Sequence, residues 1–262
     1  MALKYFISQR VASILFIFLL SLLGQERVYY ELLFLAILFK LGLAPFHGWI
    51  TSIFMRSNYH NLFIIGTVQK IIPLHLLSLF FPHSRLIYLI FSLNIILMLG
   101  LIWSQASIRL ILLLSSITNR IWILSVVNIS TEWLSFILVY SRINFSLIYF
   151  FRYLNISSLS QLNLLSSPLK IILSLITASL AGLPPFLGFI QKLLILKALL
   201  LNIEFILIII LILFSLIILW VYLRIILPLY ALAENSSSKR RRYKLSLFIS
   251  LTLFLVPGSI LL

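Results

Sequence analysis

The sequence predicts an all-α polytopic membrane protein with about nine transmembrane helices. Of its 262 residues, 63% are hydrophobic and 10% are charged, whereas soluble domains have roughly 45–50% and 25%, so a water-soluble globule is excluded. The apolar residues form long continuous runs and do not alternate with polar ones, which predicts helices as the spanning elements. The chain has no cysteine, which excludes disulfides and thiolate chemistry.

Nine apolar runs approach the length of about 20 residues that a helix needs to cross the hydrocarbon core. They cover residues 3–23, 29–43, 61–81, 86–104, 108–128, 133–151, 167–183, 204–229 and 245–261. Two shorter segments, 45–56 and 185–200, follow proline breaks and are interpreted as the second halves of broken helices. The first run has no small-residue cleavage site and further spans follow it, so we interpret it as part of the fold and not as a signal peptide.

The positions of the basic residues predict an orientation. If the N-terminus lies on side A, ten loop lysines and arginines fall on side A and only Arg27, Arg85 and Lys197 on side B. The side A residues are Lys4, Arg56, Arg109, Arg152, Lys170, Lys239, Arg240, Arg241, Arg242 and Lys244. This bias predicts that side A is the cytoplasm or the mitochondrial matrix. The run 239–244 is interpreted as a contact with anionic phospholipids, and nucleic-acid binding is disfavoured in this setting.

One internal repeat is present. Residues 42–50 (GLAPFHGWI) and 182–190 (GLPPFLGFI) are identical at six of nine positions, and both copies interrupt an apolar run with glycine and proline. Such a pair predicts a transporter with broken helices, built as one membrane domain over residues 1–262 with repeat-like halves of about 1–128 and 129–262. Two unrelated proline kinks are the alternative, and the span count leaves open whether the second copy is inverted.

Three lysines lie inside the predicted spans, each close to a helix break. Lys40 precedes Pro45, Lys70 precedes Pro73, and Lys192 follows Pro185 by seven residues. A charge at the bilayer centre costs about 2.5–3.5 kcal/mol on insertion scales, so these lysines are candidates for a proton relay. Lysine suits this role because it can lose its proton when buried, whereas arginine stays charged. Snorkelling of the lysines to an interface is the alternative.

His47, two residues after Pro45, is a further relay candidate because histidine exchanges protons at ordinary pH; a satisfied core histidine is equally expected. Three arginines, Arg120, Arg142 and Arg224, also lie in apolar spans. The chain has no aspartate and only five glutamates, so we expect these arginines to pair with acids of other chains or to line a hydrated face. No metal-ligand cluster, phosphate loop or nucleophile triad occurs, and no cofactor is expected in this chain.

Four segments occur in the order and spacing of a known family. They are 40–49 (KLGLAPFHGW), 67–73 (TVQKIIP), 115–118 (SSIT) and 182–188 (GLPPFLG). The chain thus resembles the mitochondrial NADH dehydrogenase subunit 2 family, the antiporter-like subunits of the complex I membrane arm. The resemblance covers nearly the whole chain and is specific in the first half and at 179–192, but loose over 129–165 and after 200.

The resemblance implies a fold of two inverted five-helix repeats in the mitochondrial inner membrane, with other membrane-arm subunits of complex I as partners. It implies proton translocation through Lys40, Lys70 and Lys192, coupled to electron transfer from NADH to ubiquinone elsewhere in the complex. A non-pumping structural spacer of the membrane arm is the alternative. A free-standing antiporter is disfavoured because it needs an intramembrane acid to bind its cation.

The sequence departs from the family in three places. It begins where the family has already formed two helices, so either those helices are absent or the sequence is incomplete; the family's early glutamate, the partner of the lysine at Lys40, has no counterpart. Leu110 stands where the family often has a lysine. Asn119 and Arg120 replace a usual His-Met pair, and Gln191 replaces the proline before the last key lysine.

Overall fold

The computed structural model describes residues 2–22, 27–80, 86–103 and 107–231. Within these ranges the chain forms eleven α-helices and two 3-10 helices. One isolated bridge, between Ser107 and Ser158, is the only β-type pairing among the described residues. Eight of the nine predicted spans correspond to described helices, while the ninth, 245–261, lies outside the described residues, so the count of nine stays a prediction.

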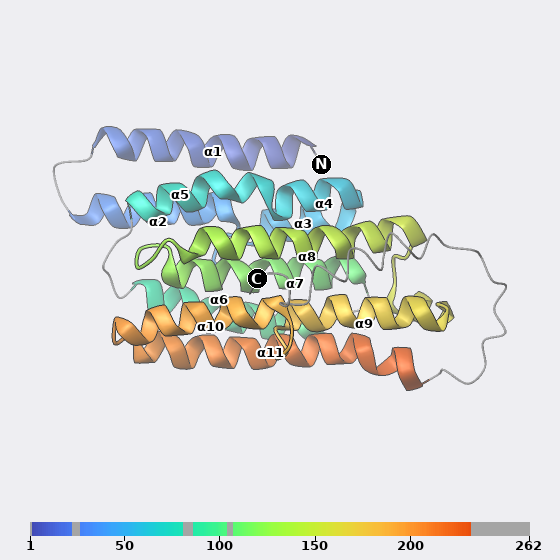
Figure 1. The fold of residues 1–262 in the computed structure, drawn as a ribbon. Helices are drawn as coiled ribbons and strands as arrows, with labels where there is room; N and C mark the ends of the chain where they lie inside the picture. Colours follow the sequence, from blue (N-terminus) through green and yellow to red (C-terminus); the bar gives the residue numbers. More distant parts are fainter. Residues whose placement is uncertain (1, 23–26, 81–85, 104–106, 232–262) are drawn as a thin grey trace.

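The helices run nearly parallel or antiparallel to one another in a bundle (Figure 1). Their bounds are α1 (Ala2–Ser21), α2 (Arg27–Leu41), α3 (Gly48–Arg56), α4 (Tyr59–Gly66), η1 (Val68–Lys70), α5 (Ile71–Leu79), α6 (Leu86–Trp103), α7 (Ile108–Val126), α8 (Glu132–Leu154), η2 (Leu159–Leu164), α9 (Ser167–Ala181), α10 (Leu187–Leu201) and α11 (Phe205–Ala231). Five helical segments are long and apolar enough to cross a membrane by length and composition. The predicted all-helical membrane fold is therefore confirmed.

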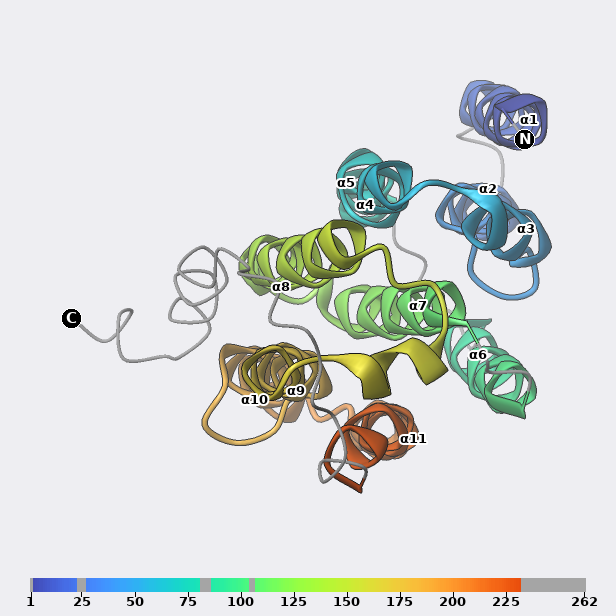
Figure 2. The ribbon, with the colours of Figure 1, turned by 90° about the vertical axis from the view of Figure 1, so that its right-hand side faces the viewer.

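Helix α7 forms the centre of the bundle. In the end-on view it lies between α8 on one side and α6 on the other, with the helices of the two breaks above and below it (Figure 2). Of its most apolar 18-residue window, 94% is buried, against 17% for α1 and 33% for α11. The central helix nevertheless carries buried polar residues, which are Ser115, Ser116, Thr118, Asn119, Arg120 and Ser125. The neighbouring helices therefore shield these buried polar residues of α7 from lipid.

Several basic residues expected on side A lie at one end of the bundle. The Arg109 side chain donates a hydrogen bond of 2.7 Å to the carbonyl of Met55, the neighbour of Arg56. Tyr59 donates from its hydroxyl to the carbonyl of Ile156, four residues after Arg152. The N-terminus of α1 points to the same end (Figure 1). The grouping agrees with the sequence assignment, and the membrane side that this end faces stays a prediction.

The first predicted break separates α2 from α3. Gly42 follows the last residue of α2 with a φ of +65°, a conformation that glycine adopts without steric cost. Its amide donates to the carbonyl of Phe39 (3.2 Å), and the amide of Leu43 donates to that of Leu38 (3.3 Å). This pair of hydrogen bonds is the Schellman motif that terminates helices.

The second break, between α9 and α10, has the same construction. Gly182 has a φ of +75°, its amide donates to Ser179 (3.2 Å), and the amide of Leu183 donates to Ala178 (3.2 Å). Each half-helix pair continues in one direction across the bundle, but α2 to α3 runs opposite to α9 to α10 (Figure 1). The repeat found in the sequence is therefore a structural repeat in inverted orientation, and the alternative of two unrelated kinks is wrong.

The third predicted span, over 61–81, contains the break that is expected beside Lys70 and Pro73, and the structure forms it as a 3-10 turn. The span consists of α4, the 3-10 turn η1 and α5, with Thr67 between α4 and η1 at φ −127° and ψ −69°. Pro73 has no amide hydrogen, and its ring clashes with the carbonyl four residues earlier, that of Gln69. The chain relieves this clash by tightening into a 3-10 turn, and Lys70 is the last residue of that turn.

The repeated glycines Gly48 and Gly188 have different surroundings and permit a matched test of packing. A methyl group at position 188 would overlap the carbonyl oxygen of Ser179, whereas one at position 48 would meet no heavy atom within 4 Å. Overpacking costs about 1–3 kcal/mol, so Gly188→Ala is expected to lower the free energy of unfolding by that amount and Gly48→Ala to leave it nearly unchanged. Unfolding of the detergent-solubilised protein, followed by circular dichroism, measures both, and equal stability of the two variants would contradict the close α9–α10 contact.

Candidate functional site

The buried guanidinium of Arg120 donates hydrogen bonds to the backbone carbonyls at the end of α2. Arg120, on α7, is only 2% exposed. Its Nη1 donates to the carbonyl of Leu41 and, at 3.5 Å, to that of Gly42. Its Nε and Nη2 donate to the carbonyl (2.7 Å) and the Oγ (2.8 Å) of Ser116 on its own helix. The guanidinium therefore joins the central helix to the first break.

This arrangement corrects the expectation that Arg120 needs an acid from another chain or a hydrated face. The last carbonyls of a helix have no partner within the helix, and the helix dipole makes that end negative. The break places this negative helix end inside the bundle, where its carbonyls accept hydrogen bonds from the buried Arg120. Of the other two arginines, Arg224 lies over the ring of Trp220, with 5.5 Å from its Cζ to the ring centroid, and Arg142 is exposed.

The second break binds a cation at the equivalent carbonyl. Lys192 of α10 is 8% exposed, and its Nζ donates a hydrogen bond of 2.7 Å to the carbonyl of Ala181. Ala181 immediately precedes Gly182, as Leu41 precedes Gly42 in the first repeat. The same Nζ lies 5.7 Å from the ring centroid of Trp122 on α7. The two breaks therefore approach α7 at residues 120 and 122, each with its own cation.

Lys70 is the third buried cation, and it is placed differently. It is 6% exposed, and its Nζ has no hydrogen-bond partner among the described residues. An ammonium buried without a hydrogen-bond partner is costly. The 3-10 turn that holds Lys70 is of the kind that often marks a functional hinge within a helix.

A line of polar side chains starts one helical turn from Lys70. Gly66 faces Asn144 of α8, so that a methyl group at position 66 would lie 3.9 Å from the Asn144 Nδ2. Asn144 is buried, and its Oδ1 has no partner in the described structure. Its Nδ2 donates a hydrogen bond of 2.8 Å to the hydroxyl of Tyr140, one turn earlier on α8. The line thus continues from the third span into α8.

The line continues from Tyr140 to Lys192. The Tyr140 hydroxyl interacts with Ser115 and Asn119 of α7. Tyr140 and Asn119 line, together with Gln191 and Lys192, a cavity with a volume of about 20 Å³. One water molecule needs a cavity of roughly 10–15 Å³, so this cavity can hold one. Two amides, one phenol and one water-sized cavity therefore connect the region of Lys70 with Lys192.

The remaining candidates, Lys40 and His47, lie outside this line. Lys40 is half-buried on α2, and its Nζ lies 5.4 Å from the ring centroid of Phe16 on α1. The backbone carbonyl of Lys40 accepts a hydrogen bond of 3.3 Å from Gln9. His47 precedes the first residue of α3, and its Nδ1 has no partner in the described part of the chain. The structure therefore places Lys192 at one end of the polar line and Lys70 one helical turn from its other end, and it leaves Lys40 and His47 apart from the line.

Three residues of the polar line were not predicted as site residues. The sequence indicates Asn119 only as a departure from a family pattern, and it does not single out Tyr140 or Asn144. A signal was present, because Tyr140 and Asn144 are four residues apart and so share one face of a helix in an apolar run. Within the described residues, no group of three or more His, Asp or Glu side chains is arranged to hold a metal ion.

Comparison with known proteins supports the family assignment. Residues 23–219 match the family described as NADH:quinone oxidoreductase/Mrp antiporter, transmembrane. The NADH-ubiquinone oxidoreductase chain 2 of Locusta migratoria is 30% identical over 251 residues, which cover 90% of this chain and 73% of the locust protein. The protein of the same name from Myxine glutinosa is 37% identical over 247 residues, which cover 86% of this chain and 70% of that protein.

Solved structures share the fold. A chain of respiratory complex I from Thermus thermophilus with bound aureothin superposes with a TM-score of 0.79 at 21% identity, covering 97% of this chain and 65% of that chain. A chain of the Mrp complex from Dietzia sp. DQ12-45-1b superposes with a TM-score of 0.73 at 18% identity, covering 91% of this chain and 52% of that chain. This chain therefore spans about two thirds and about half of the length of these two structural neighbours.

Removal of the Arg120 guanidinium tests whether it satisfies the first break. Arg120→Met leaves the carbonyls of Leu41 and Gly42 without their donor, and a buried unsatisfied polar group costs about 1–3 kcal/mol. We therefore expect a lower melting temperature, with partial recovery in Arg120→Lys. The control Arg142→Met changes an exposed arginine and is expected to stay within about 0.5 kcal/mol of the parent protein. An unchanged melting temperature of Arg120→Met would show that the carbonyls do not need the cation.

Proposed function

This chain belongs to the NADH:quinone oxidoreductase/Mrp antiporter membrane family, and we propose that it relays protons as a core antiporter-like subunit of NADH:ubiquinone oxidoreductase (complex I). As a member of this family it is a multi-pass protein of the mitochondrial inner membrane that assembles with other complex I subunits. In this proposal, electron transfer from NADH to ubiquinone takes place elsewhere in the complex and drives proton movement here. We further propose that this chain holds no cofactor and performs no redox chemistry.

The polar line between Lys70 and Lys192 is the observation that supports this function. Proton movement inside a membrane needs groups that accept and release protons, joined by groups that reorient. Lysine supplies the first property, and a phenol hydroxyl such as that of Tyr140 supplies the second because it both donates and accepts. The water-sized cavity beside Lys192 adds a place where one water molecule can bridge to Asn119. These buried polar residues are the observation that favours a relay over a subunit that only fills space.

The family's usual histidine is replaced by Asn119 in this line. An amide does not exchange protons, but it can hold a water molecule in position through its donor and acceptor groups. In this chain we therefore assign the proton-exchanging role to Lys70 and Lys192 and an orienting role to Asn119, Tyr140 and Asn144. Lys40 and His47 remain relay candidates in the proposal, without a described polar connection to the line.

A structural spacer remains a second candidate function, and one observation favours it. In the described residues, Lys40 faces the ring of Phe16 and has no carboxylate partner on α1. A relay that had to begin at Lys40 would therefore lack the acid that pairs with the lysine at this position in the family. The two functions make opposite predictions for pumping, because a spacer contributes no protons to the stoichiometry of the complex.

Neutral substitutions of the two buried lysines test the relay. Lys70→Met and Lys192→Met keep much of the side-chain volume but remove the titratable group, so we expect proton pumping of the assembled complex to fall by about 10²-fold or more through this path. Lys197→Met on the exposed face of α10 is the matched control. Proton uptake and NADH oxidation in sealed vesicles are measured together. Unchanged proton-to-electron ratios in both variants would favour the spacer.

A second test removes only the hydroxyl group in the middle of the line. Tyr140→Phe deletes the acceptor of the Asn144 hydrogen bond while keeping the ring, so we expect slower proton transfer in a complex that still assembles. Tyr88→Phe is the control, because its hydroxyl also donates a hydrogen bond (2.8 Å, to Glu204) but lies away from the line. Equal pumping rates in the two variants, with normal assembly, would exclude Tyr140 from the path.

A further inference from the structure

An exposed arginine lies in the middle of helix α8. Arg142 follows Glu132, the first residue of the helix, by ten residues and precedes Leu154, the last residue, by twelve. With a rise of 1.5 Å per residue, it lies about 15 Å and about 18 Å from these two ends. The helix is long and apolar enough to cross a membrane, whose hydrocarbon core is about 30 Å thick. Arg142 therefore lies near the middle of the membrane, away from both headgroup layers.

Arg142 differs from the other arginines that lie well inside the described helices. Arg120 donates hydrogen bonds to backbone carbonyls, Arg10 lies over the ring of Phe6 at 4.9 Å, and Arg224 lies over a tryptophan ring. The described structure gives Arg142 no hydrogen bond, ion pair or ring contact. A charge inside a membrane is costly unless it is paired or faces water. Arg142 therefore requires a partner from outside the described residues.

Apolar side chains surround Arg142 on one side of α8. Leu134, Leu138 and Arg142 follow one another at intervals of four residues, and Phe145 follows three residues later, so all four share one side of the helix. All four are exposed, and the outer side of α8 faces away from the other described helices in the end-on view (Figure 2). We call these four residues the α8 outer face. Lipid suits its apolar residues but does not suit the arginine among them.

The depth and the charge of Arg142 define the chemistry of its partner. Lipid phosphates lie at the membrane surface, so an anion in the middle of the membrane is a carboxylate on a transmembrane helix. The 262 residues do not supply this carboxylate, because they include no aspartate and their five glutamates lie outside the predicted spans or within three residues of a span end. The ninth predicted span, 245–261, contains no acidic residue.

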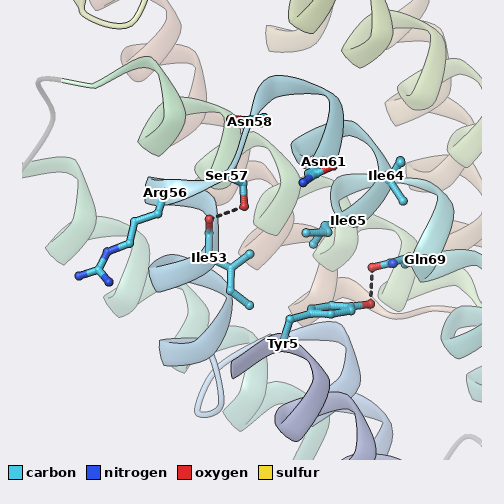
Figure 3. Close-up of a pocket in the computed structure, with 9 residues that line it drawn as sticks. All are labelled: Tyr5, Ile53, Arg56, Ser57, Asn58, Asn61, Ile64, Ile65 and Gln69. Atoms are coloured by element: carbon cyan, nitrogen blue, oxygen red, sulfur yellow. Dashed lines mark hydrogen bonds between the residues drawn. The ribbon is translucent and has the colours of Figure 1, made fainter. Parts of the chain in front are cut away.

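A groove elsewhere on the surface of the bundle makes no such demand. It lies between the start of α1, the end of α3 and α4, and its volume is about 460 Å³ (Figure 3). The side chain of Arg56 points away from the two asparagines of its lining, and the hydroxyl of Tyr5 donates to the Oε1 of Gln69, so these two groups satisfy each other (Figure 3). The groove therefore does not specify the charge of an occupant, whereas the α8 outer face does.

We propose that the α8 outer face binds a transmembrane helix of another complex I subunit, and that an aspartate or glutamate near the middle of that helix pairs with Arg142. A carboxylate accepts two parallel hydrogen bonds from a guanidinium, which fixes the depth of the partner helix as well as its charge. Leu138 and Phe145 pack on apolar residues about one turn to either side of the acid. The contact is independent of the proton relay, because it is measured as subunit association and not as pumping.

Subunit retention in the assembled complex tests the ion pair. Arg142→Gln leaves the partner's carboxylate unpaired, so we expect a loss of the partner subunit after detergent extraction of about tenfold or more, with partial recovery in Arg142→Lys. Arg152→Gln is the matched control, because Arg152 is exposed in the last turn of the same helix, near the membrane surface. Native electrophoresis with mass spectrometry measures each subunit. Equal retention of all subunits in Arg142→Gln and Arg152→Gln would overturn the proposal.

The folding of the variant is checked separately. Nothing in the described structure contacts the Arg142 guanidinium, so the melting temperature of the isolated Arg142→Gln chain in detergent is expected to equal that of the parent protein. A lower melting temperature would place the partner of Arg142 within this chain and would contradict the proposal.

A second measurement keeps Arg142 in place and identifies the occupant. A photo-crosslinking amino acid at position 138 is expected to label another subunit at a transmembrane segment, with an aspartate or glutamate within about one helical turn of the labelled residue. Arg142→Glu and the exchange of that acid for arginine are each expected to weaken the association, and the two changes together are expected to restore it. Labelling of lipid alone, or of a segment without an acid, would exclude the proposed partner.

Discussion

The structure depends on the binding of cations by the free carbonyls at the ends of broken helices. A helix that ends inside a bundle leaves carbonyls without partners, and in a membrane no bulk water is present to satisfy them. Arg120 and Lys192 satisfy these carbonyls at the two breaks. The same contacts solve a second problem, because a chain with 20 basic and 5 acidic residues cannot pair its interior cations with its own acids.

The two breaks are equivalent in backbone but not in chemistry. Their glycines, their Schellman hydrogen bonds and the carbonyls that accept the cation correspond residue by residue. The first carbonyl binds an arginine, which keeps its proton in proteins, and the second binds a lysine, which can release it. One half of the repeat is therefore held with a permanent charge, whereas the other holds an exchangeable one next to a water-sized cavity. The two halves of the inverted repeat therefore differ in whether the cation at the break can release its proton.

The candidate site was partly accessible from the sequence. An ionisable residue in an apolar run has to be buried or at an interface, and on this basis Lys70 and Lys192 were selected correctly as buried residues. Lys40 belongs to the same class, yet the structure leaves it half-buried against Phe16, because burial depends on which helices cover a face and not on the run itself. The partners of Arg120 were mispredicted, since side-chain charge is visible in a sequence whereas free backbone carbonyls are not.

The sequence by itself determined the helical membrane fold, the two breaks and their repeat, because hydrophobic length, proline and glycine act locally on the backbone. Only the tertiary structure decided the rest. It showed that the breaks run in opposite directions, that the third span tightens at Lys70, and that α7 lies at the centre. It also aligned Asn144, Tyr140 and Asn119 into one line. These features depend on contacts between residues far apart in the chain, which no local pattern records.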